Sequence, residues 1–335
     1  MNRTYLMADV VDVGTAPLPR VAFVREPTPL HQAARLSDAL GVEVWFKRDD
    51  LTGIGLGGNK LRGLEYLIAD ALTQGCDSLV TGAGPQSNWA MLAALTARQV
   101  GIEPYLVHYG PPTVATGNLL LIDLIKVDRR FTGSPDRTSV DDEMVRLCNN
   151  LVASGRKPYA IPRGGASSRG AAGYVRAGIE LDHQWREFGA APSQIWLPTG
   201  SCTTHAGLVT AARWLGWSAE IVGVTVSRPS GECTERIEEI SASCASLLDI
   251  TTPADRPIQV IDGYIGPGYG IASPAGNAAA ALVAELEGIF LDPLFGAKAM
   301  AALIDAAHEG RVSGPVVFLA TGGAPTLFAA GKVFV

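Results

Sequence analysis

Short apolar segments alternate with segments of helical periodicity along most of the chain, and glycine-rich turns separate many of them. This order is typical of an α/β protein with a largely parallel sheet, because each parallel connection returns over one face of that sheet. A chain of 335 residues exceeds the usual capacity of one hydrophobic core, so we expect two open, twisted, parallel-sheet lobes. The predicted strands cover 42–47, 78–81, 104–108, 159–162, 194–198, 220–226 and 316–320. The predicted helices cover 62–74, 88–100, 141–154, 173–188, 204–215, 232–248, 273–286 and 297–309, while 119–125 fits either type.

Charge and composition exclude several classes of protein. The net charge is −6, so neither nucleic acid nor an anionic membrane is an expected partner. Charged residues make up only 18% of the chain, which indicates contacts between subunits. The five cysteines are scattered and form no Cys-x-x-Cys pair, so we expect no metal site, no disulfide framework and a reducing, cytoplasmic location. Residues 1–6 contain no apolar run, and we expect neither an export signal nor a membrane span.

A lysine follows two glycines in the segment 47–62. Gly57 and Gly58 permit a tight turn and close approach to a ligand, and Asn59 is a candidate helix cap. Lys60 then lies in the first turn of the helix, where a positive charge is unfavourable. A neutral amine is what Schiff-base chemistry requires, although a solvated lysine after a glycine loop explains this segment equally well.

A second turn joins the strand 194–198 to the next helix. It offers backbone N–H groups, hydroxyls and a helix N-terminus together, which suits the phosphate of a monoester. An ordinary capped helix remains the alternative. The candidate phosphate-binding residues are Thr199, Gly200, Ser201, Cys202, Thr203 and Thr204.

Two further turns carry polar side chains at strand ends, where α/β sheets bind ligands. Gln86, Ser87 and Asn88 follow the strand 78–81, and simple helix capping is the alternative for them. Thr321 follows the final strand, and its hydroxyl can hydrogen-bond a heterocycle nitrogen. A phosphate site, a poised lysine and this threonine together suggest pyridoxal phosphate.

Several segments resemble one family in the same order from about Pro27 to Phe328. This is the D-cysteine desulfhydrase and 1-aminocyclopropane-1-carboxylate (ACC) deaminase family, which belongs to the tryptophan synthase β superfamily, fold type II of the pyridoxal-phosphate enzymes. The resemblance is carried by Lys47-Arg48-Asp49-Asp50, Gly57-Gly58-Asn59-Lys60, Gln86-Ser87-Asn88, Thr199-Gly200-Ser201, Thr204-His205-Ala206-Gly207-Leu208, Gly268-Tyr269-Gly270, Glu287-Gly288-Ile289, Leu291-Asp292-Pro293 and Thr321-Gly322-Gly323-Ala324-Pro325.

The resemblance implies roles for the residues at these positions. Lys60 carries pyridoxal 5'-phosphate as a Schiff base and moves the substrate α-proton, while Ser87 and Tyr269 complete the catalytic set. The implied cofactor contacts are Asn59, Lys60, Asn88, Thr199, Gly200, Ser201, Cys202, Thr203, Thr204, Thr321 and Gly322. The implied substrate pocket holds Gln86, Ser87, Trp89, Tyr269 and Phe295. The implied domains are a large cofactor-binding domain, 1–60 and 164–335, and a small α/β domain, 61–163, in a homodimer.

The chain departs from the family pattern mostly around the expected substrate. Phe295 and Gly296 replace a tyrosine and its polar neighbour, and Trp89 replaces a histidine, so hydroxyl and acid/base groups are lost there. Pro85 stands where isoleucine is common. Gly63 replaces the family's second lysine, which leaves the phosphate to backbone, hydroxyls and the candidate cation Arg62.

These residues leave several functions open. The first is a pyridoxal-phosphate-dependent lyase that eliminates a β-substituent from a small amino acid, as D-cysteine desulfhydrase does, to give a keto acid and ammonia. The second is β- or γ-replacement, or cyclisation, of a non-standard amino acid. ACC deaminase activity and a non-catalytic ligand-binding protein are weaker alternatives.

Overall fold

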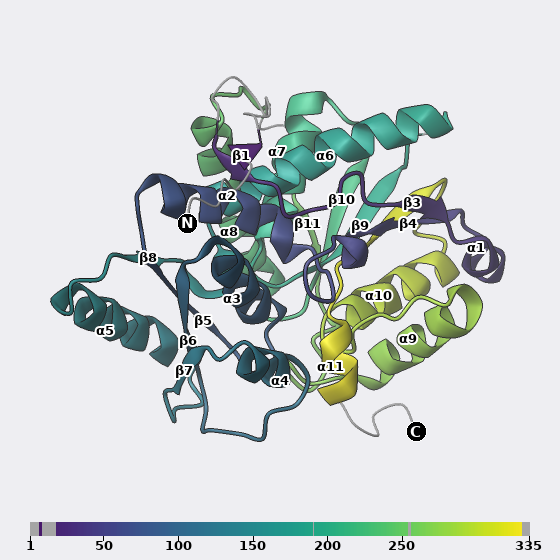
Figure 1. Cartoon of the computed structure of the whole chain (residues 1–335). Coiled ribbons are helices and arrows are strands. Elements are labelled where there is room, and N and C mark those ends of the chain that lie inside the picture. Colours follow the sequence, from purple (N-terminus) through teal and green to yellow (C-terminus); the bar gives the residue numbers. More distant parts are fainter. Residues whose placement is uncertain (1–6, 9–17, 190, 254–255, 330–335) are drawn as a thin grey trace.

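The structure is a computed structural model, and it describes residues 7–8, 18–189, 191–253 and 256–329. The expectation of no export signal in residues 1–6 concerns residues outside the described part. The described residues form two main sheets, each covered by helices, together with a short antiparallel pair, β1 (Met7–Ala8) and β2 (Arg20–Val21). Figure 1 shows the two sheets beside each other, with the helices packed around them.

The larger sheet has six strands in the order β11-β10-β9-β12-β4-β3. All neighbours are parallel except β3, which pairs antiparallel with β4 at one edge. Its strands are β3 (Leu30–Gln32), β4 (Val44–Arg48), β9 (Gln194–Thr199), β10 (Glu220–Thr225), β11 (Gln259–Ile261) and β12 (Val316–Ala320).

Helices cover both faces of this sheet because its strands alternate apolar side chains between the two sides. On β12, Val317 and Leu319 pack into one core, and Val316 and Phe318 pack into the other. The first core is completed by α6 (Ser168–Phe188), α7 (Thr203–Leu215) and α8 (Ser230–Leu247). The second is completed by α1 (Ala34–Leu40), α9 (Pro274–Glu287) and α10 (Gly296–His308).

The smaller sheet has four parallel strands in the order β7-β6-β5-β8. Its strands are β5 (Ser78–Ala83), β6 (Glu103–His108), β7 (Asp128–Phe131) and β8 (Pro158–Ala160). One face packs on α2 (Lys60–Thr73), α3 (Asn88–Val100) and α4 (Gly117–Leu124). The other packs on α5 (Ser139–Ala153), and the remaining short helices are η1 (Asp49–Leu51), η2 (Arg163–Gly165) and α11 (Ala324–Ala329).

Glycines bring α2 and α6 into close contact. A Cβ atom on Gly173 of α6 would lie 2.1 Å from the carbonyl oxygen of Arg62, and one on Gly63 would lie 2.8 Å from that of Gly170. Helix α6 starts at Ser168, five residues before the predicted start, with the Ser167 hydroxyl accepting from the Gly170 N–H. Gly170 and Gly173 thus lie inside α6, where they permit close helix packing.

The predicted order of strands and helices is confirmed for the main elements, and 119–125 lies largely in helix α4. The structure adds elements that the sequence did not predict, namely the pair β1 and β2, the helices α1, α11, η1 and η2, and the three strands β3, β7 and β11 of the two main sheets. The three strands are only three or four residues long, too short for a periodic pattern, and all lie at sheet edges. The boundaries of the two domains stay a prediction.

Two features are absent from the residues that the structure describes. No helix among them is long and apolar enough to cross a membrane. No group of three or more His, Cys, Asp or Glu side chains among them is arranged to hold a metal ion. All five cysteines are free.

Candidate active site

A cavity of roughly 950 Å³, including its open mouth, lies where the C-terminal ends of β5, β9, β10 and β12 meet. Parallel sheets bind ligands at these ends because strand-to-helix turns gather there. The cavity brings together residues from both sheets that are far apart in the sequence. Its lining residues that the sequence predicted are Asn59, Lys60, Ser87, Asn88, Trp89, Gly200, Ser201, Tyr269, Phe295 and Thr321.

The lysine loop is built as its glycines predict. Gly57 and Gly58 have φ angles of 72° and 136°, and Lys60 is the first residue of α2. The prediction that Asn59 caps this helix is wrong, because Asn59 has helical backbone angles and makes no side-chain cap bond. Its amide instead donates to Oγ1 of Thr204, 3.0 Å away. The loop is thereby tied to the first turn of α7.

Burial lowers the pKa of the Lys60 ammonium to about 8, while the carboxylate of Asp292 opposes this shift. The sequence suggested the helix N-terminus as the reason for easier deprotonation of this amine, whereas the structure attributes the lowered pKa to burial. Asp292 is itself buried and accepts hydrogen bonds from the backbone of Leu294, Phe295 and Gly296. The lysine is thus a mostly charged group at neutral pH with a substantial neutral fraction.

The turn after β9 leaves a helix N-terminus free for an anion. Helix α7 begins at Thr203, and the residue before it, Cys202, has φ 72° and provides no side-chain cap. Thr203 and Thr204 line a smaller cavity that also touches Asn59 and Lys60. Uncapped N–H groups and hydroxyls therefore face the space beside the lysine.

Helix α3 begins at the cavity wall with Ser87 as its N-cap, which accepts from the Ala90 N–H. The carbonyl oxygen of Asn88 accepts a hydrogen bond from the Asn118 amide at 2.7 Å, which leaves the Asn88 NH2 group as a donor. The indole of Trp89 packs on Gly165 and donates to Thr81 Oγ1 at 2.9 Å. The only polar hydrogen of the indole is therefore not available to a ligand.

Two aromatic side chains form another part of the wall. Tyr269 and Phe295 lie with ring centroids 5.9 Å apart. Burial raises the pKa of Tyr269 to about 12, so its phenol stays protonated. The neighbouring Gly296 N–H is occupied by Asp292.

Six predicted contacts do not line this cavity; Thr203 and Thr204 line the smaller one, and the other four lie elsewhere. The Thr199 hydroxyl contacts Nδ1 of His205, and the Gln86 side chain binds Thr116 and Asn118 at the start of α4. The other two, Cys202 and Gly322, serve packing: the Cys202 thiol turns toward Gly200 O and Cys233. A Cβ on Gly322 would lie 2.7 Å from Gly58 Cα, so this glycine is required by the lysine loop.

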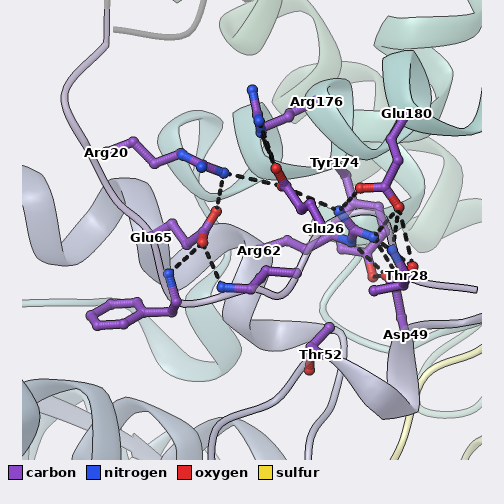
Figure 2. Close-up of polar contacts among 12 residues, drawn as sticks. Arg20, Glu26, Thr28, Asp49, Thr52, Arg62, Glu65, Tyr174, Arg176 and Glu180 are labelled. Carbon is purple, nitrogen blue, oxygen red and sulfur yellow. Dashed lines mark hydrogen bonds and ion pairs between the residues drawn. The ribbon is translucent and has the colours of Figure 1, made fainter. Parts of the chain in front are cut away.

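Arg62 is not available for a phosphate, contrary to the expectation from the sequence. It is buried and donates to both carboxylate oxygens of Asp49 and to Glu180, as Figure 2 shows. Tyr174 also donates to Asp49, and Thr28 completes the group. This ion network fastens the first turn of α2 to α6 and to the end of β4.

Sequence reasoning missed a set of cations that line the cavity, namely Arg137, Arg163, Arg228 and Arg236. They come from the loop before α5, from η2, from the turn after β10 and from α8. No motif joins them in the sequence, because only the folded arrangement of both sheets brings them together. Asn118, which orients Asn88, was missed for the same reason.

Comparisons with known proteins agree on one family. The sequence model described as "Pyridoxal-phosphate dependent enzyme" matches residues 21–322. The chain belongs to this family of pyridoxal-phosphate-dependent enzymes. It is 40% identical over 319 residues to a D-cysteine desulfhydrase of Salmonella typhimurium, covering 93% of this chain and 96% of that protein.

Solved structures of pyridoxal-phosphate enzymes share the fold. The chain is similar to a crystal structure described as an ACC deaminase homologue, with a TM-score of 0.89, 34% identity and 95% of each chain covered. It also resembles the processed form of threonine deaminase isoform 2 from Solanum lycopersicum, with a TM-score of 0.65 and 18% identity, covering 90% of this chain and 80% of that one. The second likeness concerns the fold alone. The fold type II architecture expected from the sequence is confirmed.

The residues present fit pyridoxal 5'-phosphate. Lys60 is a partly desolvated amine at the cavity wall, α7 starts without a side-chain cap, and the Asn88 NH2 group is left free to donate. Thr321, at the end of β12, adds a hydroxyl residue to the same wall. These groups match the aldehyde, phosphate, ring oxygen and ring nitrogen of the cofactor in chemical type.

Proposed function

We propose that the protein is a lyase that removes a β-substituent from a small amino acid, with D-cysteine as the first candidate substrate. Sulfide, pyruvate and ammonia would be the products from D-cysteine and water. The proposal rests chiefly on Lys60, an amine of lowered pKa in a cavity whose walls suit the cofactor. The 40% identity to a D-cysteine desulfhydrase over most of both chains supports it.

Each part of the cavity has a role in this proposal. The cofactor supplies an electron sink when it is bound. Lys60 holds it and then accepts the α-proton of the substrate, for which a pKa of about 8 is well matched to neutral pH. Ser87 and the first N–H groups of α3 bind the substrate carboxylate. Tyr269 and Phe295 cover the reacting carbon and exclude water.

The remaining predicted residues hold the cofactor in place. Backbone and hydroxyl groups of Gly200, Ser201, Thr203 and Thr204 bind the phosphate. The Asn88 amide donates to the ring oxygen, and Thr321 meets the ring nitrogen. A neutral hydroxyl there leaves the nitrogen largely unprotonated, which suits elimination of a good leaving group.

The test is to incubate the holoenzyme with D- and L-cysteine and to measure sulfide, pyruvate and ammonia together. Lys60→Ala should abolish turnover and the visible absorbance of lysine-bound cofactor, whereas Lys157→Ala, at a lysine distant from the cavity, should retain both. A cofactor spectrum that survives in Lys60→Ala contradicts the assignment. A new amino acid in place of keto acid, when a nucleophile is supplied, identifies replacement instead.

We further propose a homodimer in the cytoplasm. The low charged fraction of 18% supports a subunit interface, and five free cysteines fit a reducing compartment. Light scattering of the purified holoenzyme tests the dimer, and a monomeric mass at micromolar concentration contradicts it.

A further inference from the structure

The cavity wall is strongly cationic. Lys60 and four arginines line it, and none of its described lining residues is Asp or Glu. The arginines come from four separate elements, so they do not form one solvated helix face. Such a concentration of like charge is unfavourable unless an anion occupies the cavity.

Among the described residues, two of the four arginines have a carboxylate partner, and the other two do not. Arg163 and Arg228 are neutralised, since they pair with Asp141 at 2.8 Å and with Glu232 at 3.0 Å. Arg137 and Arg236 form no ion pair with any residue that the structure describes. Arg137 lies 4.7 Å above the ring of Tyr269, which places its guanidinium against the proposed substrate site. Two cationic groups therefore remain available for a ligand.

Arg236 has one buried N–H group, at Nε, without a hydrogen-bond partner among the described residues. A buried guanidinium N–H without an acceptor is costly, and such groups in folded proteins usually meet a ligand or ordered water. Arg236 lines the same cavity as Tyr269 and Ser201.

The other expected anions have their own sites. The uncapped start of α7 suits the cofactor phosphate, and the start of α3 suits the substrate carboxylate. Both sites rely on helix N-termini rather than on arginine. Arg137 and Arg236 are thus left over once these two anions are placed.

We propose that Arg137 and Arg236 bind a second anionic group on the substrate side chain, so that the substrate is an amino acid with a sulfonate or phosphate on its β-carbon. This inference rests on the proposed lyase function. For a sulfonate, the α-proton passes to Lys60, the Cβ–S bond breaks, and its electron pair leaves with sulfite. Water then releases pyruvate and ammonium. For a phosphate ester, the Cβ–O bond breaks and phosphate leaves.

The first experiment measures binding without reaction. Calorimetry on the holoenzyme compares 3-sulfopropanoate, which has no amino group, with propanoate. We expect the sulfonate to bind about 10- to 100-fold more tightly, as charge-assisted hydrogen bonds to arginine allow. The preference should disappear in Arg236→Gln and Arg137→Gln. It should persist in Arg311→Gln, a matched change at an exposed arginine that pairs with Glu309.

The second experiment measures turnover of both enantiomers of cysteate, O-phosphoserine and cysteine. The ratio of kcat/KM for an acidic substrate to that for cysteine should fall about 10- to 100-fold in Arg236→Gln. Arg236→Lys keeps the charge and should retain part of the wild-type ratio. This variant can still be measured if Arg236→Gln fails to fold. Preference for cysteate or for phosphoserine identifies the anion, and either supports the proposal.

Three results separate this inference from the proposed function. Equal binding of the two probes, with turnover of cysteine alone, overturns the inference and leaves the lyase function intact. An equal loss of affinity for both probes in the arginine variants also overturns the inference, because the arginines then bind only the carboxylate that the two probes share. A sulfonate preference that the variants abolish, without turnover of any amino acid, supports the anion site and overturns the lyase function.

Discussion

The side-chain amide of Asn59 donates a hydrogen bond to Oγ1 of Thr204 across 3.0 Å. Both side chains are buried, and they come from the loop before α2 and the first turn of α7. Because Asn59 immediately precedes Lys60, this bond sets the lysine relative to the turn that we propose binds the phosphate. It joins the two halves of the candidate cofactor site directly.

Removal of this bond should weaken cofactor binding. We expect Asn59→Ala and Thr204→Val each to raise the cofactor dissociation constant about 2- to 10-fold, since one net hydrogen bond is worth about 0.5–1.5 kcal/mol. Fluorescence titration of the apoprotein measures the constants. The double variant should lose less binding free energy for the cofactor than the sum of the losses in the two single variants.

Thr96→Val serves as the control for the Asn59–Thr204 prediction. Its hydroxyl is also buried but bonds only within α3, to the carbonyl oxygens of Leu92 and Ala93. We expect no change in cofactor affinity for this variant. Strictly additive losses in the Asn59/Thr204 pair would mean that the bond does not couple the two segments.

The apoprotein should become more stable when Lys60 is replaced by methionine. Burial lowers the pKa of Lys60 from its ordinary value of 10.5 to about 8 in the folded state, so folding disfavours the charged form. Below pH 8 both states are protonated and the penalty is fully present; it fades as the pH rises from 8 to 10.5. Lys60→Met should therefore raise the free energy of unfolding by about 1–3 kcal/mol at pH 7.

Urea unfolding of the two apoproteins at several pH values measures this difference. We expect the gap to close toward pH 10, because wild-type Lys60 is then neutral in the folded state. A gap that stays constant between pH 7 and pH 10 would show that the Lys60 charge is not its cause.

Replacement of Gly63 by alanine should destabilise the protein. A Cβ at this position would lie 2.8 Å from the carbonyl oxygen of Gly170, so α2 and α6 must separate. We expect a loss of about 1–3 kcal/mol in the free energy of unfolding. The matched control is Gly231→Ala in α8, where a Cβ meets nothing within 4 Å. That change should be neutral or stabilising by up to about 1 kcal/mol, and similar results for both would refute the packing argument.

Loss of the Arg62 guanidinium should be far more harmful than loss of a surface arginine. Arg62→Met leaves the buried carboxylates of Asp49 and Glu180 short of a partner (Figure 2). Breaking a buried ion network in this way costs about 3–5 kcal/mol. Arg311→Gln breaks an exposed pair and should change stability by less than about 1 kcal/mol, as urea unfolding can measure. Comparable effects of the two variants would contradict this role of Arg62.

Local sequence determined the elements and the motifs. The alternation of apolar and helical segments predicted the main strands and helices, because periodicity and helix stop signals act within one segment, and the chain length predicted two lobes. Gly57 and Gly58 predicted the turn before Lys60 for the same reason, since positive φ angles are a local property of glycine. The family resemblance then placed Ser87, Tyr269 and Thr321 at one site, and all three line the cavity.

Tertiary structure alone decided what these groups contact. Asn59, which the sequence predicted to cap a helix, hydrogen-bonds Thr204 instead. Arg62, a candidate phosphate ligand, lies at the centre of a buried ion network. Arg137 and Arg236 reach the cavity from elements that no local pattern connects. Charge and hydrogen-bond partners depend on distances between distant segments, and only the packing of both sheets sets those distances.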